Sequence, residues 1–140
     1  MARAVVPVIE LKGSGKTVKI GATRTPMIVG ERINPTNRKE LIAKLKFGEF
    51  AMLEGEAKKQ VQNGADILDI NVGVPGIDEK HAMLEALRIV QDAVEVPVWI
   101  DTSNPDVLAA GLKAVRGRPG GLLRRHLDPR QRDQPPEPVY

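Results

Sequence analysis

The sequence contains no cysteine and only two histidines, so several common kinds of site are excluded at the outset. Without cysteine the chain can form no disulfide, no thiolate metal site and no cysteine nucleophile. His81 and His126 are too few for a histidine-rich metal centre, and we expect no bound metal ion. Aromatic residues make up 3% of the chain, so the core must be built from aliphatic side chains.

The charge balance and the lack of a long hydrophobic run narrow the class of partner. The chain has 21 Lys and Arg against 18 Asp and Glu, a balance too even to indicate nucleic-acid binding. No apolar run approaches the roughly 20 residues of a membrane span, and no signal peptide is recognisable. With 140 residues, enough for one domain of ordinary size, the sequence predicts a cytoplasmic protein without nucleic-acid or membrane partners.

The first 25 residues are expected to form a β-hairpin. Two β-rich segments, Val5–Leu11 and Thr17–Ile20, flank a Gly-Ser-Gly-Lys turn. The string Gly13-Ser14-Gly15-Lys16-Thr17 also resembles the end of a phosphate-binding loop. However, Glu10 occupies the position where that motif needs its first glycine, and a strand pattern follows where a helix is required. The hairpin turn is therefore the favoured interpretation.

The next part of the chain alternates short apolar strands with amphipathic helices. The predicted buried strands are 26–29, 67–70 and 96–100, and each is followed by a helical pattern. Such alternation predicts a parallel sheet with right-handed crossovers, and thus the α/β class.

Sequence signals also mark where these helices begin and which side they bury. Asn37, with Glu40 three residues later, predicts a capping box for the first helix. Asp78 is expected to cap the helix from about residue 79 to 93, and Asn104-Pro105-Asp106 is a strong start signal for the last one. In that last helix the predicted buried stripe is Leu108, Leu112 and Val115, and Gly117 ends it.

Each predicted strand runs into polar residues. Glu31 and Asn34 follow the first, Asp69 and Asn71 lie at the end of the second, and Asp101 and Asn104 follow the third. The carboxyl ends of parallel strands meet at one edge of a sheet, and α/β proteins build their sites there. Residues of these types also cap loops and helices, so each of them alone has a purely structural alternative.

This pattern stops at Gly117. From there to Tyr140 the sequence is dominated by Arg and Pro, with no strand predicted where a fourth is due, and the composition is typical of disorder. The alternatives are a natural flexible tail and a frameshift or truncation near Pro119. We favour the second, because reading a GC-rich gene out of frame yields such an abrupt change.

Three segments in order resemble the pterin-binding barrel family. They are Gly-Glu-Arg-Ile-Asn-Pro-Thr from Gly30, Gly-Ala-Asp-Ile-Leu-Asp-Ile-Asn-Val-Gly from Gly64, and Ile-Asp-Thr-Ser-Asn from Ile100. They look most like methyltetrahydrofolate:corrinoid methyltransferases and the folate domain of cobalamin-dependent methionine synthase. The resemblance implies the N-terminal portion of a TIM (β/α)8 barrel, about three β-α units plus the hairpin. The implied domains are a hairpin at 1–25, a partial pterin-binding barrel at 26–118 and an Arg/Pro-rich tail at 119–140.

The resemblance also implies a function and a set of ligand contacts. The pterin of tetrahydrofolate would be bound by Asp101, Asp69, Asn71, Glu31, Asn34 and Asn104. The implied reaction, part of one-carbon metabolism, moves the methyl group of N5-methyltetrahydrofolate to the cobalt of a corrinoid such as cobalamin, held by a separate protein. The family's fourth-strand Asn, which supports N5, has no match in this chain. We therefore assign no catalytic residue, expect the truncated chain to be inactive, and expect a homodimer only for a full-length relative.

Dihydropteroate synthase is the sibling alternative, since it shares the barrel and acids like Asp69 and Asp101. Its first strand typically ends in Asn-Val-Thr-Pro-Asp-Ser-Phe and its second tip carries Gly-Gly-Glu-Ser. This chain has Glu-Arg-Ile-Asn-Pro-Thr and Asn-Val-Gly-Val-Pro-Gly at the matching places. The differences favour methyl transfer. A non-catalytic pterin-binding fragment is the third alternative.

Overall fold

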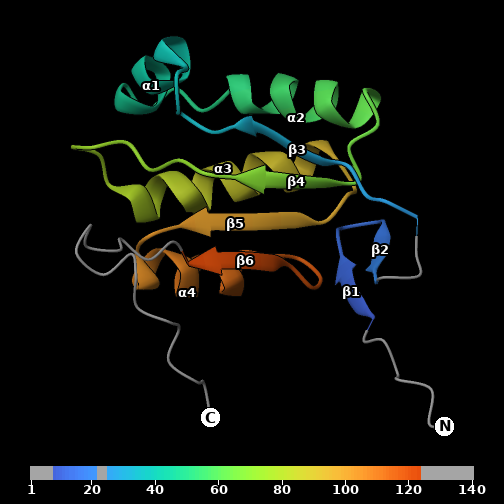
Figure 1. Cartoon of the computed structure of the whole chain (residues 1–140). Helices are drawn as coiled ribbons and strands as arrows, with labels where there is room; N and C mark the ends of the chain where they lie inside the picture. The colour runs from blue at the N-terminus through green and yellow to red at the C-terminus, as the bar shows by residue number, and fades with distance from the viewer. Residues whose placement is uncertain (1–7, 22–24, 124–140) are drawn as a thin grey trace, which may run out of the picture.

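A four-stranded parallel sheet forms the centre of the structure, with helices packed on one of its faces (Figure 1). The computed structural model describes residues 8–21 and 25–123. The strands lie side by side in the order β3 (Val29–Ile33), β4 (Ile67–Ile70), β5 (Val98–Thr102) and β6 (Gly120–Leu123), and all neighbours are parallel. The helices between them are α1 (Lys39–Lys46), α2 (Met52–Gln62), α3 (Glu79–Ala93) and α4 (Pro105–Ala114). This alternation confirms the predicted α/β class and a partial barrel-like fold.

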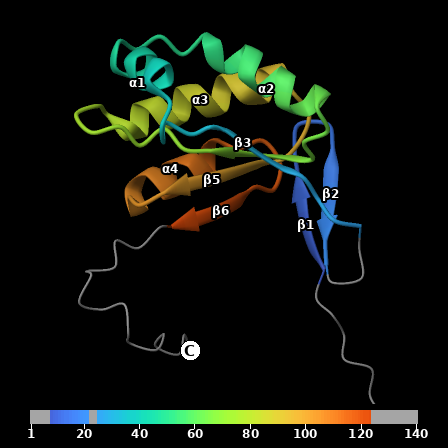
Figure 2. The same cartoon turned by 45° about the horizontal axis from the view of Figure 1, so that its top comes forward.

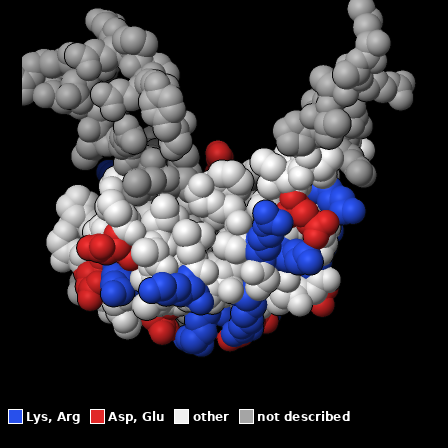
Figure 3. Space-filling view, turned by 90° about the horizontal axis from the view of Figure 1, so that it is seen from below, with Lys and Arg blue, Asp and Glu red and all other residues white. Residues whose placement is uncertain are grey.

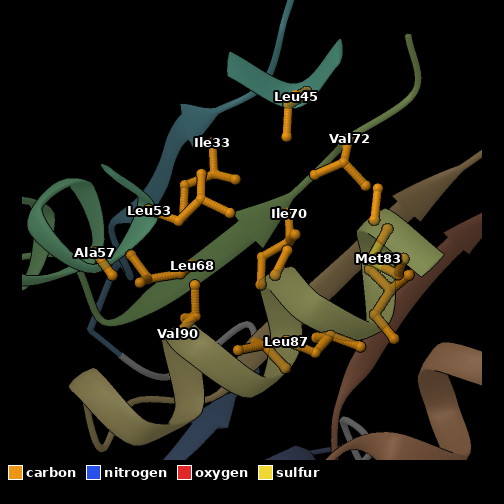
Figure 4. Close-up of a cluster of buried hydrophobic side chains, with 14 of the residues drawn as sticks. Ile33, Leu45, Leu53, Ala57, Leu68, Ile70, Val72, Met83, Leu87 and Val90 are labelled. Carbon is orange, nitrogen blue, oxygen red and sulfur yellow. The ribbon is translucent and has the colours of Figure 1, made fainter. Parts of the chain in front are cut away.

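The main core lies between the sheet and its helices (Figure 4). Successive side chains of a strand point to opposite faces of the sheet, and Leu68 and Ile70 of β4 point toward the helices, fully buried. Met83, Leu87 and Val90 on one side of α3 pack in the same cluster. The core is thus aliphatic, as the scarcity of aromatic residues predicts. Because the helices pack on β4, this strand is the buried centre of the fold.

A hairpin of β1 (Ile9–Lys12) and β2 (Thr17–Ile20) lies beside the N-terminal ends of the sheet strands (Figures 1 and 2). Its side chains Leu11 and Val18 pack against Ile67 of β4, on the face of the sheet opposite the helices. This second, smaller cluster explains why Ile67 is buried on the face of β4 opposite the helices. The predicted hairpin is confirmed for Ile9–Lys12 and Thr17–Ile20, while residues 5–7 of its predicted first segment lie outside the described residues.

The hairpin turn is docked on the loop between α3 and β5. The hydroxyl of Ser14 donates to the carbonyl of Val94 at 3.1 Å, and the backbone N–H of Lys16 donates to the carbonyl of Glu95 at 2.9 Å. A Cβ atom at Gly13 would stand only 2.1 Å from that Glu95 oxygen. The turn therefore requires glycine for close packing, which accounts for the Gly-Ser-Gly string without a phosphate.

The first sheet strand begins later than the sequence predicts. A buried strand at 26–29 is wrong: β3 starts at Val29, and Ile28 and Val29 are 56% and 44% exposed. The physical reason is that β3 is an edge strand of the described sheet. Its register against β4 shifts between Gly30 and Ile33, an irregularity of the kind that β-bulges produce at sheet edges.

A strand is present where the sequence predicts none. Residues Gly120–Leu123 form β6, parallel to β5, with Trp99 opposite Gly120. A Cβ atom at Gly120 would stand 2.0 Å from the indole of Trp99, so the absence of a side chain lets the ring lie against the strand. The backbones of Lys12 and Arg118 also exchange two hydrogen bonds, of 2.8 and 3.0 Å. The expectation that no fourth strand follows is thus wrong, and the rest of the predicted tail, 124–140, lies outside the described residues.

Two of the three predicted helix caps are confirmed. Asp78 accepts from the backbone N–H of His81 at 3.0 Å, and Asn104 accepts from that of Asp106 at 2.9 Å. The capping box at Asn37 is wrong, because that residue has a left-handed φ of 58° and α1 begins after Arg38 without a side-chain cap.

The predicted stripe of α4 is wrong at Leu112, which is 42% exposed. Val107 and Gly111 are the buried residues of this helix instead. A Cβ atom at Gly111 would stand 2.9 Å from the side chain of Ile100, so the missing side chain lets the helix approach the sheet at that point. The helix is therefore rotated relative to the predicted stripe.

The described surface mixes charges of both signs. In the view from below in Figure 3, Lys and Arg side chains lie next to Asp and Glu around the rim. None of the helices in the described ranges combines the length and apolar character needed to cross a bilayer, and the longest, α3, has 15 residues.

Candidate functional site at the C-terminal edge of the sheet

Three of the predicted site residues share the face of the sheet that points away from the helices. Because Leu68 and Ile70 point toward the helices, Asp69 and Asn71 lie on the opposite face. On β5 the same alternation places Asp101 on the face of Trp99. The register pairs Asp69 with Trp99. Two residues further along each strand, Asn71 therefore lies next to Asp101.

A side-chain hydrogen bond joins two of these residues. The amide nitrogen Nδ2 of Asn71 donates to Oδ2 of Asp101 at 3.3 Å, while its oxygen Oδ1 accepts from the backbone N–H of Gly73 at 3.0 Å. The two ends of the amide thus have different partners, which fixes its orientation. Asp101 is 1% exposed and Asp69 is 7% exposed, so two acidic residues are held in a largely water-excluded place.

The other three predicted residues lie further out, and two of them have local structural roles. Glu31 is exposed on the edge strand β3. Oδ1 of Asn34 accepts from the backbone N–H of Thr36 at 2.9 Å, which makes a local turn. Asn104 caps α4. The structural alternative is therefore realised at Asn34 and Asn104, and ligand contacts by all six side chains stay a prediction.

A second hydrogen-bonded pair at this edge, Thr102 with the partly buried Glu79, is not among the residues that the sequence predicts. The hydroxyl of Thr102, which is 2% exposed, donates to Oε1 of Glu79 at 2.6 Å and accepts from the backbone N–H of Asn104 at 3.1 Å. Glu79 stands in the first turn of α3, where acids are common because of the helix dipole. A threonine directly after Asp101 was the available signal, but nothing local indicates its partner.

Two open grooves border this edge. One, of about 400 Å³, lies between the loop after β3 and the loop after β4, with Pro35, Asn37, Gly73 and Pro75 among its lining residues. The other, of about 670 Å³, lies between the first turns of α3 and α4. Within the described ranges, no three His, Asp or Glu side chains are grouped so that they could hold a metal ion. The chemistry available here is hydrogen bonding by buried carboxylates and amides.

Comparison with protein families connects this edge to a ligand class. Residues 30–119 match the family described as pterin binding enzyme, which is more than half of the chain. The matched range begins in β3 and ends just before β6, so it contains Asp69, Asn71 and Asp101 together with Glu79 and Thr102.

Proposed function

Since the chain belongs to the pterin-binding enzyme family, we propose that Asp101, Asp69 and Asn71 hold the pterin ring of a reduced folate at the C-terminal edge of the sheet. The observation that carries this proposal is the Asn71–Asp101 hydrogen bond, which fixes a buried carboxylate within the matched range. In parallel α/β folds, ligands are bound at this end of the strands.

The chemistry of the pterin ring suits a carboxylate in this position. The 2-amino group and N3–H of the ring are adjacent donors, and a carboxylate can accept both in a charge-assisted pair. Each carboxylate oxygen has two lone pairs, so Oδ2 of Asp101 can accept from the ligand while it accepts from Asn71. Asp69, on the same face, is within the same matched range and is assigned to another edge of the ring.

The proposed reaction, for an intact family member, is methyl transfer from N5-methyltetrahydrofolate to the cobalt of a corrinoid carried by a partner protein. The 140-residue chain itself is expected to bind the folate without turnover. The N5–CH₃ bond breaks, the methyl group passes to cobalt(I), and N5 keeps the bonding electron pair and takes up a proton. The corrinoid supplies the nucleophile, and the share of this chain is to position the folate. The sequence of β6 is Gly-Gly-Leu-Leu, without the Asn that the family resemblance implies on the fourth strand, so we assign no residue to that proton.

Binding is tested first, by titration calorimetry of the 140-residue chain with N5-methyltetrahydrofolate. Asp101→Asn should weaken binding by about 5- to 150-fold, because removing the charge costs roughly 1–3 kcal/mol of hydrogen bonding. Asp92→Asn is the matched control, since Asp92 is exposed near the end of α3 and makes surface ion pairs. Equal affinity in a folded Asp101→Asn variant, or no binding by the unaltered chain, would refute the proposal.

The reaction class is tested separately with the same protein. Conversion of cob(I)alamin to methylcobalamin, followed by absorbance, would support methyl transfer. Condensation of a pterin pyrophosphate with p-aminobenzoate would instead support the dihydropteroate synthase-like alternative. Folate binding with neither reaction would assign the chain as a binding module.

A further inference from the structure

We infer that Glu79 is a positioning residue of the pterin site, which holds Asp101 and Asn71 in place from the helix side of the sheet. This inference rests on the proposed function, because the site that it shapes is the one assigned there to the pterin. Glu79 itself belongs to α3 and is separated from Thr102 by 23 residues of chain.

The first contact runs through Thr102. A hydroxyl has a single proton, and Oγ1 of Thr102 already accepts from the backbone N–H of Asn104 at 3.1 Å. Its proton is therefore directed to Oε1 of Glu79, at 2.6 Å. This bond between a hydroxyl and a carboxylate ties the first turn of α3 to the end of β5.

The position of Thr102 in β5 explains why this tie affects the site. Thr102 directly follows Asp101, and the two side chains point to opposite faces of the sheet. Thr102 is 2% exposed, so its side chain cannot move without disturbing its neighbours. Fixing Thr102 therefore fixes the backbone from which Asp101 projects.

The second contact is with the loop that follows β4. A Cβ atom at Gly73 would lie 3.4 Å from Oδ1 of Asn71 and 3.6 Å from Oε1 of Glu79. Both oxygens thus border the space that a side chain at Gly73 would fill. Because the N–H of Gly73 donates to Oδ1 of Asn71, Glu79 lies close to the loop residue that orients Asn71.

Both contacts lead to the same pair of ligand-binding side chains. Glu79 reaches Asp101 through Thr102 and reaches Asn71 through Gly73, while the Asn71–Asp101 hydrogen bond joins the two routes. A change at Glu79 should therefore alter pterin affinity although its carboxylate does not face the ligand.

The test compares the folate affinities of five variants of the 140-residue chain. Glu79→Ala and Thr102→Val should each raise the Kd by about tenfold, the effect of one lost hydrogen bond to a charged group. The double variant should lose no more than the weaker-binding single variant, since both changes remove one interaction. Glu79→Gln keeps an oxygen acceptor for Thr102 and should recover most of the affinity. Glu85→Ala, on the same helix and in a surface ion pair with Arg88, should bind like the unaltered chain.

Amide hydrogen exchange at Asn104 supplies a readout that does not depend on the ligand. Its N–H should exchange faster in Glu79→Ala, because Thr102 is then free to rotate away from it. If the unaltered chain binds folate and Glu79→Ala binds equally well, the inference is overturned while the proposed function stands. If Glu79→Ala lowers the melting temperature in proportion to its loss of folate affinity, and Glu79→Gln restores neither, the inference is also overturned. That result is what a purely structural role of Glu79 would give. If the unaltered chain binds no reduced folate, the proposed function fails and this inference fails with it.

Discussion

The amide nitrogen of Asn71 and the carboxylate of Asp101 meet at 3.3 Å, although the two residues are 30 positions apart in the sequence. They are neighbours because β4 and β5 pair in parallel with a register that places Ile70 opposite Ile100. The orientation of the Asp101 carboxylate, which is a candidate to bind the ligand, therefore depends on the side chain of Asn71 from another strand.

This dependence leads to a prediction at Asn71. Asn71→Ala removes one donor from the buried Asp101 and one acceptor from Gly73, and should lower the free energy of unfolding by about 1–3 kcal/mol. Folate affinity should fall with it. Urea unfolding and calorimetric titration measure the two effects, and Asn63→Ala, at an exposed residue after α2, is the control. Unchanged values of both would show that the pair has no energetic role.

A second prediction concerns the core beneath the site. Leu68→Ala should lower the free energy of unfolding by about 2–5 kcal/mol, because Leu68 is 0% exposed among the helices. Leu112→Ala makes the same chemical change at a residue that is 42% exposed and should cost far less. Thermal and urea unfolding of both variants check this. Equal losses would mean that the assigned faces of β4 and α4 are wrong.

The docking of the hairpin turn can be tested with two glycines. Gly13→Ala places a Cβ atom 2.1 Å from a backbone oxygen of Glu95, so it should destabilise the chain or release the hairpin. Gly55→Ala, in α2 with nothing within 4 Å of its added Cβ atom, should stabilise by about 0.5–1 kcal/mol. Opposite signs in thermal unfolding are the expected result. A Gly13→Ala variant as stable as Gly55→Ala would contradict the close packing.

Asn104 allows its two assigned roles to be separated. Asn104→Ala removes the cap of α4 and should cost about 0.5–2 kcal/mol of stability. Asn104→Asp keeps an oxygen at the cap but removes the amide donor, so its stability should be close to that of the unaltered chain. If Asn104 also binds the folate, as the family resemblance implies, Asn104→Asp will bind more weakly. Equal affinity would leave Asn104 with the cap alone.

The open edges of the described sheet lead us to expect that copies of the chain associate with one another. Within the described sheet β3 and β6 are the two edge strands, and open strand edges favour pairing with another chain. Size-exclusion chromatography of the 15.3 kDa chain should show species larger than a monomer. Val29→Lys, on the exposed part of β3, should reduce them, whereas Leu112→Lys on α4 should not. A monomer at all concentrations would contradict this expectation.

The sequence was informative where local patterns decide the structure. Asp69 and Asn71 were recognisable as polar residues at the end of a strand, and the alternation along β4 places them opposite the buried Leu68 and Ile70. The caps at Asp78 and Asn104 were also readable, because a short polar side chain there bonds to backbone groups two or three residues away.

The sequence did not predict the structure correctly where contacts with distant parts of the chain determine it. Gly120–Leu123 has weak strand propensity of its own and becomes β6 by pairing with β5 against the ring of Trp99. The apolar run at 26–29 was predicted to be buried, but as part of an edge it is not covered. The Glu79–Thr102 bond joins two residues that are 23 positions apart in the sequence, so no local sequence pattern indicates it.

The docking of the hairpin also has a consequence for the order of events during protein synthesis. The hairpin leaves the ribosome before its docking partner, because Ser14 binds a carbonyl 80 residues later in the chain. At about 5–20 residues per second, its docking partner emerges roughly 4–16 seconds afterwards. Until Ile67 and Trp99 have been made, the apolar side chains of Leu11 and Val18 have no sheet to cover them, so the newly made hairpin is an expected binding site for chaperones.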